Sequence, residues 1–270
     1  MRKLAIVGGG KMGEALVGGL IHSGWAQPDQ IIVAEIHESR RDALAAEYQV
    51  STTADTIEAV KDCPTVLLAV KPQDMDAVLE VCSGVITTEQ LVLSIAAGIP
   101  TAYIEKRLGA NVPVVRAMPN TPALLREGAT AIAAGTHATD EHMAHADEIL
   151  SAVSRIVHLP ERYLDAVTGV SGTGPAYVFF LAESLIEGAV GVGLPRDTAT
   201  ELVCQTLLGA ARMLRETGRH PVELREEVTS PGGTTVAAMS VLEHKGVRSA
   251  FLDAVKAATE RSRQLAEEHD

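Results

Sequence analysis

Cysteine is scarce in this sequence of 270 residues, which contains only Cys63, Cys82 and Cys204. No two of them form a C-x-x-C pair, and the number is odd. Both features argue against a disulfide framework and predict reduced thiols in a cytoplasmic protein. Cys204 lies in an apolar helical pattern, where we expect a buried thiol.

Basic residues are fewer than acidic ones, and the sequence contains no long apolar run. Lys and Arg number 23 against 35 Asp and Glu, which gives a formal net charge of −12. Such a balance argues against nucleic acid or an anionic membrane as a partner. No run reaches the roughly 18 apolar residues that a membrane-spanning helix requires, so we expect no membrane partner. The apolar run at the start is also too short for a signal peptide.

Short β-branched runs alternate with helical patterns up to about residue 160. The helical patterns include Glu14–His22 and Ser39–Ala46. This alternation is typical of a parallel α/β sheet, so the fold class is α/β with residues 1–160 as the first domain. The runs that we interpret as strands are KLAIVG, QIIVAE, TVLLAVKP, QLVLSIAAG, VPVVRAMP, ATAIAAG and RIVHLP.

From residue 161 to residue 270 no strand pattern recurs, and the remaining segments are typical of helices separated by Gly and Pro. We therefore predict an all-α second domain over 161–270. The patterns Ala176–Leu194 and Asp197–Glu216 are apolar around much of their circumference. A small helical domain cannot cover such helices on every side, so we predict a homodimer built on this half.

A first glycine-rich turn follows the first strand pattern. Gly8, Gly10 and Gly13 form G-x-G-x-x-G before a helical pattern, and a second strand ends at Glu35 about twenty residues later. This is the full context of a Rossmann-type dinucleotide site, in which the pyrophosphate rests on a helix N-terminus. The first domain is therefore predicted to bind NAD(H), NADP(H) or both, without a metal.

The choice of dinucleotide stays open at this point. Glu35 would accept hydrogen bonds from a ribose 2′-hydroxyl and repel a 2′-phosphate, which favours NAD. His37, Arg40 and Arg41 follow at once and offer charges that could neutralise a phosphate. The two arginines could equally form a solvated helix face.

Further candidate cofactor residues stand at the ends of later strands. Lys71 in AVKP could meet phosphate or ribose, and the small residues of SIAAG, Ser94–Gly98, would let the nicotinamide or ribose approach the backbone. The predicted cofactor-binding residues are Val7, Gly8, Gly9, Gly10, Lys11, Met12, Gly13, Glu35, Ala69, Val70, Lys71, Pro72, Ala96, Ala97 and Asn120.

A second glycine-rich turn, TSPGGTTVAAM, begins at Thr229 and opens another helical pattern. Gly232 and Gly233 would expose backbone N–H groups, and Thr234 and Thr235 would add N–H groups of the first helical turn. Such a turn can hold an anion, but it is equally a helix N-terminus capped by Ser230 or Thr234.

Several motifs together resemble the pyrroline-5-carboxylate reductases of proline biosynthesis. AVKP, SIAAG, RAMPNTPA, VSGTGPAY and HPVELREEVTSPGGTT stand in the order and at the spacing of that family, over nearly the whole chain. Thr173 stands where Ser is more usual, and Glu35 is more typical of NAD binding than the residue of many members.

The resemblance implies an NAD(P)H-dependent oxidoreductase that acts on a C=N bond and reduces 1-pyrroline-5-carboxylate to L-proline. It implies that Ser230, Gly232, Gly233, Thr234 and Thr235 bind the substrate, with Ser230 and Thr235 as catalytic residues. The hydroxyl at Thr235 is expected to hydrogen-bond the imine nitrogen and to position a proton. The helical domains of two subunits are expected to interlock, and a higher oligomer of dimers is a further option.

Other interpretations stay open beside this one. They are another imine or β-hydroxyacid reductase of the same plan and a non-catalytic dinucleotide sensor. Lys245 and Lys256 are the only lysines of the later helices, and neither stands in a β-hydroxyacid motif. SGTGPAY is either a ligand-contacting turn or a break that lets helices pack closely. The run THATDEHMAHADE, with His137, His142 and His145, is interpreted as a solvated helix face and not as a metal site.

Overall fold

The computed structural model describes residues 1–109 and 111–267. Contacts within the chain divide it into two compact units. Unit 1 comprises residues 1–173 and 256–270, and unit 2 comprises residues 174–255. The sequence predicts the boundary at 160/161, whereas the contacts place it at 173/174 and return the last part of the chain to unit 1.

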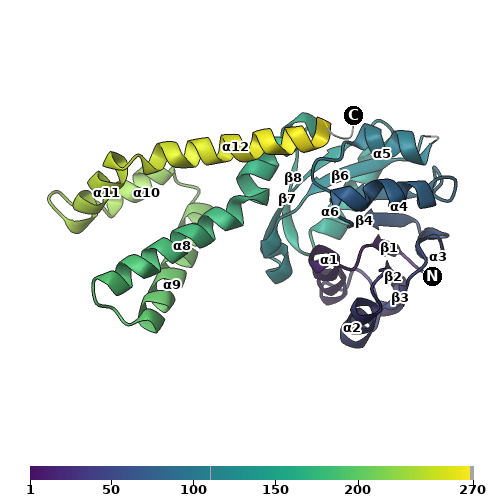
Figure 1. Ribbon diagram of the computed structural model, residues 1–270, viewed down its shortest axis with the longest axis horizontal. Coiled ribbons are helices and arrows are strands. Elements are labelled where there is room, and N and C mark those ends of the chain that lie inside the picture. The colour runs from purple at the N-terminus through teal and green to yellow at the C-terminus, as the bar shows by residue number, and fades with distance from the viewer. Residues whose placement is uncertain (110, 268–270) are drawn as a thin grey trace. The chain divides into compact units, whose positions relative to one another are not determined.

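Unit 1 contains, within its described residues, an eight-stranded sheet in the order β3-β2-β1-β4-β5-β6-β7-β8 (Figure 1). The first six strands of this order match a dinucleotide-binding Rossmann sheet. The strands are β1 (Leu4–Val7), β2 (Ile31–Ala34), β3 (Ser51–Thr53), β4 (Thr65–Leu68), β5 (Leu91–Ser94), β6 (Val114–Met118), β7 (Gly128–Ala134) and β8 (Ser154–His158).

Helices cover both faces of this sheet, and alternate residues of each strand face the two layers. One core contains the apolar side chains of α1, α2 and α6 against residues such as Ile6 and Val33. The other packs α3, α4 and α5 against residues such as Val7 and Leu68. The helices are α1 (Lys11–His22), α2 (Glu38–Tyr48), α3 (Thr56–Val60), α4 (Met75–Cys82), α5 (Thr101–Leu108) and α6 (Asp140–Leu150).

All seven strand runs expected from the sequence are present, and two details of the sheet differ from expectation. Strand β3 was missed because its sequence, Ser-Thr-Thr, is polar and partly exposed at the sheet edge. Strand β7 runs antiparallel to β6 and not parallel. The connection between them contains only the short 3₁₀ helix η3 (Thr121–Leu125), and a parallel return requires a longer crossover.

A buried charged cluster joins several elements of unit 1. The Arg116 side chain lies in β6, where only 4% of the residue is exposed. Its Nη1 lies 3.2 Å from Glu161 Oε1, and its Nη2 lies 3.9 Å from Asp165 Oδ1. The Glu161 carboxylate accepts hydrogen bonds from the Thr101 N–H and hydroxyl at the start of α5, while Ser262 donates to Asp165. Because a buried charge needs partners, this cluster fixes the contacts between β6, α5 and the segments around residues 161–165 and 262.

The chain from residue 161 onward forms helices only, as expected, among the residues that the structure describes. They are the 3₁₀ helix η4 (Glu161–Tyr163), α7 (Leu164–Val167), the π-helix η5 (Thr168–Gly172), α8 (Gly174–Gly191), α9 (Arg196–Thr217), α10 (Pro221–Glu227), α11 (Thr234–His244) and α12 (Val247–Glu267). The described helices include none that is long and apolar enough to cross a membrane.

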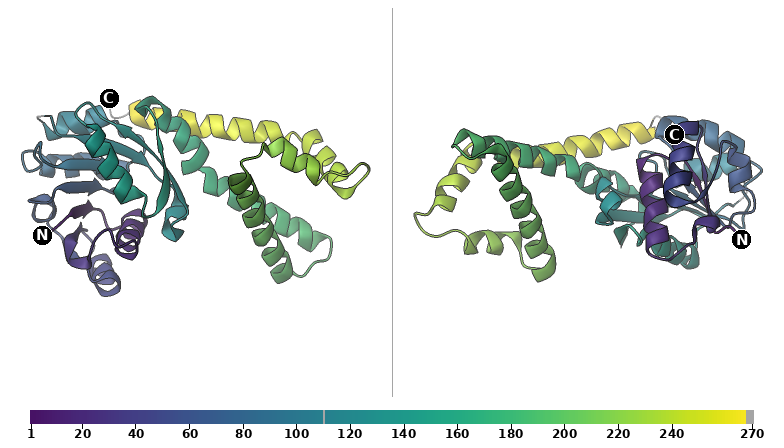
Figure 2. Two further views of the ribbon diagram at one scale, coloured as in Figure 1. Left: turned by 180° about the vertical axis from the view of Figure 1, so that it is seen from behind. Right: turned by 90° about the horizontal axis from the view of Figure 1, so that it is seen from below.

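In unit 2, α8 and α9 pack as a hairpin (Figure 2), closed by an ion pair between Arg196 and Glu187 at 2.7 Å. No residue of α8 is buried within the chain, and Phe180 remains 68% exposed. The sequence predicted a buried thiol for Cys204, which was wrong for the single chain, because this face of α9 lacks cover and the residue is exposed.

Candidate active site

The residues that follow three neighbouring strands meet at the carboxyl edge of the sheet. Val7 of β1 pairs in register with Ala34 of β2 and with Leu68 of β4. The next residues of these strands, Gly8, Glu35 and Ala69, therefore lie at one level of this edge. The hydrogen bonds from Gly8 N–H to Ala34 O and from Ala69 N–H to Val7 O, both 2.8 Å, confirm this level. Ligands of open α/β sheets bind at such a point.

Two of the three motif glycines are required by the fold itself. A Cβ on Gly13 would stand 2.3 Å from the carbonyl oxygen of Gly8, so β1 and α1 cross in direct backbone contact. Gly8 has φ of +107°, and a Cβ there would stand 2.7 Å from the Ala69 carbonyl oxygen. These two positions tolerate no side chain, whatever the site binds.

The third motif glycine, Gly10, is not required by any protein contact. A Cβ at this position would have no atom within 4 Å, and the φ of −67° suits any residue. Gly10 is exposed and is the N-cap of α1. In the described chain no hydrogen-bond partner is recorded for the N–H groups of Gly10, Lys11 or Met12. Open space beside unpartnered donors at a helix N-terminus fits a bound pyrophosphate.

Glu35 lies beside this turn, with 10% of its side chain exposed. Its Oε2 accepts a hydrogen bond from Gly9 N–H at 2.9 Å, and its Oε1 accepts from the backbone N–H of His37 at 2.9 Å. The His37 Nδ1 lies 2.8 Å from the same Oε1. Burial raises the pKa of the Glu35 carboxyl, but the hydrogen bonds from His37 and Gly9 outweigh it, so the pKa lies below its ordinary value. The carboxylate is therefore ionised at neutral pH.

Neither arginine after β2 forms a solvated face, because both are bonded to the protein. Arg40 Nε donates to Gly9 O at 2.6 Å, and its Nη2 forms an ion pair with Glu14 Oε2 at 2.5 Å. Arg41 Nη1 donates to the carbonyl oxygens of Glu35 and Ile36. Sequence reasoning missed these contacts, because no local signal joins residues that lie 31 positions apart in the chain.

The remaining predicted cofactor residues divide into exposed and engaged ones. Lys71 is exposed at the start of the 3₁₀ helix η2 (Pro72–Asp74), where its carbonyl accepts from the Asp74 N–H and its ammonium group has no recorded partner in the described chain. In SIAAG, Ala96 is buried, and a Cβ on Gly98 would stand 3.1 Å from the Cβ of Leu265, so this glycine serves helix packing. The Asn120 amide is used twice in the protein: Nδ2 donates to Ser171 O, and Oδ1 accepts from the Ala129 N–H.

The second glycine-rich turn lies in unit 2 and precedes α11. Gly233, not Ser230 or Thr234, is the N-cap, and no side chain caps the helix. Gly232 has φ of +70°, which favours glycine. The expectation that Gly233 exposes its N–H was wrong, since this group donates to Ser230 O at 3.0 Å and closes the turn.

Other donors of this turn remain available. The N–H groups of Thr234, Thr235 and Val236 have no partner recorded among the described residues. Ser230 is exposed and Thr235 is half-buried. An uncapped helix N-terminus with two nearby hydroxyls is suited to holding a carboxylate.

The SGTGPAY segment contains a helix defect. Residues Thr168–Gly172 form a π-helix, and the Thr173 N–H and hydroxyl both donate to Thr168 O. A Cβ on Gly172 would stand 2.7 Å from the terminal methyl carbon of Met118, so this glycine packs closely against a side chain of β6 and not against a second helix. A Cβ on Gly174 would have no atom within 4 Å.

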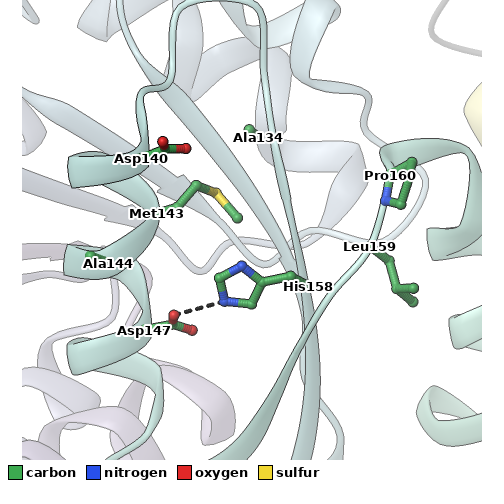
Figure 3. Close-up of a pocket in the computed structure, with 8 residues that line it drawn as sticks. All are labelled: Ala134, Asp140, Met143, Ala144, Asp147, His158, Leu159 and Pro160. Carbon is green, nitrogen blue, oxygen red and sulfur yellow. Dashed lines mark hydrogen bonds and ion pairs between the residues drawn. The ribbon is translucent and has the colours of Figure 1, made fainter.

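A cavity of about 520 Å³ lies between α6 and β8 (Figure 3). Its polar groups include the pair of His158 Nε2 and Asp147 Oδ2 at 2.7 Å, and none of the predicted site residues lines it. His142 of α6 hydrogen-bonds to Thr139 at the helix start, and His145 lies against the Trp25 ring. Among the residues that the structure describes, no three His, Cys, Asp or Glu side chains are grouped to hold a metal ion.

Two family models match separate parts of the chain. A family model described as "Pyrroline-5-carboxylate reductase dimerisation" matches residues 161–265. A second model, described as "NADP oxidoreductase coenzyme F420-dependent", matches residues 3–98. The first model thus begins at the boundary expected from the sequence, while the compact units divide further along the chain.

Several pyrroline-5-carboxylate reductases match this chain over nearly its whole length. The chain is 47% identical to a pyrroline-5-carboxylate reductase of Synechocystis, over 97% of this chain and 98% of that protein. It is 44% identical to one of Methanosarcina acetivorans, over 98% of both chains. The solved pyrroline-5-carboxylate reductase of Coxiella burnetii has a TM-score of 0.90 at 38% identity, over 98% of both chains. A Plasmodium falciparum pyrroline carboxylate reductase with NADP bound has a TM-score of 0.89 at 27% identity, also over 98% of both chains.

The different spaces around Gly10 and Gly13 predict opposite phenotypes. Gly10→Val should leave the melting temperature unchanged. It should raise the dissociation constants of NADH and NADPH by about tenfold, which corresponds to about 1.4 kcal/mol of binding free energy. Gly13→Val should lower the free energy of unfolding by roughly 3 kcal/mol, because its side chain must displace the Gly8 carbonyl. Thermal melts and dinucleotide titrations of both variants test this. Unchanged dissociation constants for Gly10→Val would contradict the assignment of the turn.

Proposed function

The chain belongs to the pyrroline-5-carboxylate reductase family, and on this premise we propose that it reduces 1-pyrroline-5-carboxylate to L-proline with a nicotinamide dinucleotide. The observation that carries the proposal is the glycine-rich turn at the carboxyl edge of the sheet, where Gly10 keeps space open beside unpartnered N–H groups. The test is oxidation of NADH or NADPH at 340 nm that depends on the imine, with L-proline identified as the product.

The dinucleotide supplies a hydride from C4 of its dihydronicotinamide ring. Gly10, Lys11 and Met12 would hold its pyrophosphate through their N–H groups, and the ionised Glu35 would accept the ribose hydroxyls. Lys71, exposed at the end of the neighbouring strand, would approach phosphate or ribose. The Asn120 side chain would hold Ser171 and the start of β7 in place and would not contact the cofactor through these two groups.

The substrate carries one carboxylate and one ring nitrogen, and the turn before α11 offers groups for both. The N–H groups of Thr234, Thr235 and Val236 would hold the carboxylate, with the exposed Ser230 hydroxyl as a further donor. The Thr235 hydroxyl would hydrogen-bond the imine nitrogen, which becomes more electrophilic as it accepts a proton or hydrogen bond. A threonine hydroxyl is a weak acid, so its task is to position the proton and not to be its source.

Both dinucleotides are proposed as substrates, with NADH favoured. The carboxylate of Glu35 is fixed by Gly9 and His37, and both nearby arginines are bonded elsewhere. A 2′-phosphate at this position would therefore face a fixed negative charge, while Arg40 is paired with Glu14 and Arg41 Nη1 is bonded to backbone carbonyl oxygens. The family model that names NADP and the NADP-bound relative support acceptance of NADPH as well.

The chain is also proposed to act as a homodimer through its helical half. The family model for dimerisation covers residues 161–265, and α8 leaves large apolar side chains such as Phe179 and Phe180 exposed. An apolar area of this kind needs cover, and a second copy with two-fold symmetry would provide it.

Glu35→Ser should raise the catalytic efficiency with NADPH relative to NADH by roughly tenfold, because a carboxylate facing the 2′-phosphate is removed. Glu35→Gln is the matched variant, since its amide oxygen can still accept the Gly9 N–H while the charge is gone. The measurement is the ratio of the two efficiencies in each protein. A ratio that stays at the wild-type value in both variants would show that Glu35 does not face the ribose.

Thr235→Ala should lower kcat by roughly ten- to a hundredfold and change the KM of the imine less, because the backbone donors remain. Ser240→Ala removes an exposed hydroxyl from the same helix and should leave both constants unchanged. Steady-state kinetics at saturating dinucleotide give the comparison. If KM rose and kcat did not fall, the hydroxyl would be a binding group only.

Phe180→Asp should shift the protein from dimer to monomer in sedimentation at assay concentration, because a buried carboxylate would replace an apolar contact. Leu125→Asp is the control, since Leu125 is a large exposed apolar residue as well but belongs to unit 1. A wild-type protein that is fully active as a monomer would refute the dimer.

A further inference from the structure

The peptide groups around Gly9 are held by residues that follow β2, and both bonds are short. The Gly9 N–H donates to Glu35 Oε2 at 2.9 Å, and the Gly9 carbonyl accepts from Arg40 Nε at 2.6 Å. Gly9 itself is buried, and a Cβ there would stand 2.8 Å from a methyl group of Leu44 in α2. The centre of the glycine turn is therefore fixed from the side of β2 and α2.

The direction of the Gly9 carbonyl determines the direction of the next N–H group. The described chain contains no cis peptide bond, so the Gly9 C=O and the Gly10 N–H point in opposite directions. Because Arg40 holds the carbonyl on the α2 side, the Gly10 N–H faces away from α2. No partner is recorded for this N–H in the described chain, and the space at Gly10 is open.

Arg40 is itself held by a second contact. Its Nη2 lies 2.5 Å from Glu14 Oε2, and Glu14 stands in the first turn of α1. The exposed fractions of these two side chains are 29% and 23%. The guanidinium thus bridges the glycine turn, α1 and α2, and it also neutralises a carboxylate beside the helix N-terminus where an anion would bind.

We propose that Arg40 is a positioning residue for dinucleotide binding, which aims the Gly10 N–H at the pyrophosphate by holding the Gly9 carbonyl. The inference rests on the proposed function, because it takes the glycine turn as the pyrophosphate site. This role differs from a contact with the 2′-phosphate, because Nε and Nη2 of Arg40 are bonded to Gly9 O and to Glu14 Oε2. The effect of Arg40 must then be the same for every ligand that contains the pyrophosphate.

The test measures dissociation constants of ADP-ribose, NADH and NADPH for wild type and Arg40→Met. In Arg40→Met all three dissociation constants should rise by the same factor, about tenfold. The kcat at saturating dinucleotide and the KM of the imine should stay within about twofold of the wild-type values. Arg155→Met removes an exposed arginine from β8 and should change none of these values. A loss confined to NADPH would overturn the proposal, because it would place Arg40 on the 2′-phosphate.

A second pair of variants separates the carbonyl contact from the charge of Glu14. Arg40→Met leaves the Glu14 carboxylate unpaired near the bound anion, and Glu14→Gln in the same protein removes that charge. The double variant should recover only part of the affinity, because the Gly9 carbonyl is still released. Full recovery would overturn the proposal in favour of simple charge neutralisation.

Arg40→Lys provides a measurement that does not depend on the folding of Arg40→Met. Lysine keeps the positive charge and one donor position. The dissociation constants of the three ligands should therefore rise by the same factor, about threefold, which is less than for Arg40→Met. Unchanged binding of all three ligands would overturn the proposal. Binding of ADP-ribose separates the two levels of inference. If the wild-type protein does not bind ADP-ribose, the assignment of the glycine turn as the pyrophosphate site fails. If wild type and Arg40→Met bind ADP-ribose equally well, only the role of Arg40 fails.

Discussion

The proposed dinucleotide site depends on one close approach of two backbone segments, that of Gly13 to the carbonyl of Gly8. The distance of 2.3 Å from a hypothetical Cβ to that oxygen means that α1 can start at the end of β1 only if position 13 carries no side chain. This crossing brings the first N–H groups of α1 to the carboxyl edge of the sheet. It also places the Gly9 peptide within reach of Glu35 and Arg40 from the neighbouring strand and helix.

The parts of this architecture that the sequence predicts are those with local causes. Short apolar runs identify the buried strands, since alternate residues of each strand meet a helix layer on each face. The glycine spacing and Glu35 predict a dinucleotide site at the carboxyl edge of the sheet, because both signals lie within one β-α-β segment of the sequence. Strand β3 escaped detection because a polar sheet edge has no apolar pattern, and the direction of β7 depends on the length of a connection. Arg116 stands in an apolar strand, which signals a buried charge, but its partners lie 45 and 49 positions away in sequence and no local pattern identifies them.

The turn before α11 shows a different limit of sequence reasoning. The motif shows that backbone donors are present, but the turn consumes some of them internally. The Gly233 N–H donates to Ser230 O and closes the turn. The donors that remain available are therefore the N–H groups of Thr234, Thr235 and Val236. Similarly, an apolar helical pattern indicates that the apolar side chains must be buried, but it does not indicate whether the same chain or a second subunit buries them. Cys204 and Phe180 are therefore exposed in the single chain although their helices are rich in apolar residues.

Both proposed anion sites rely on backbone N–H groups in a chain with a net charge of −12. The arginines nearest to the cofactor edge and within the β6 core are paired with carboxylates, Arg40 with Glu14 and Arg116 with Glu161. Such pairs hold long side chains in one conformation, while a helix N-terminus presents donors whose directions the backbone already fixes. A hydride transfer requires the donor carbon and the acceptor carbon at a defined separation, so rigid donors serve it better than mobile charges. Arg40 then acts through the Gly9 carbonyl that it holds, and the acidic character of the chain does not oppose the binding of anions at the helix N-termini.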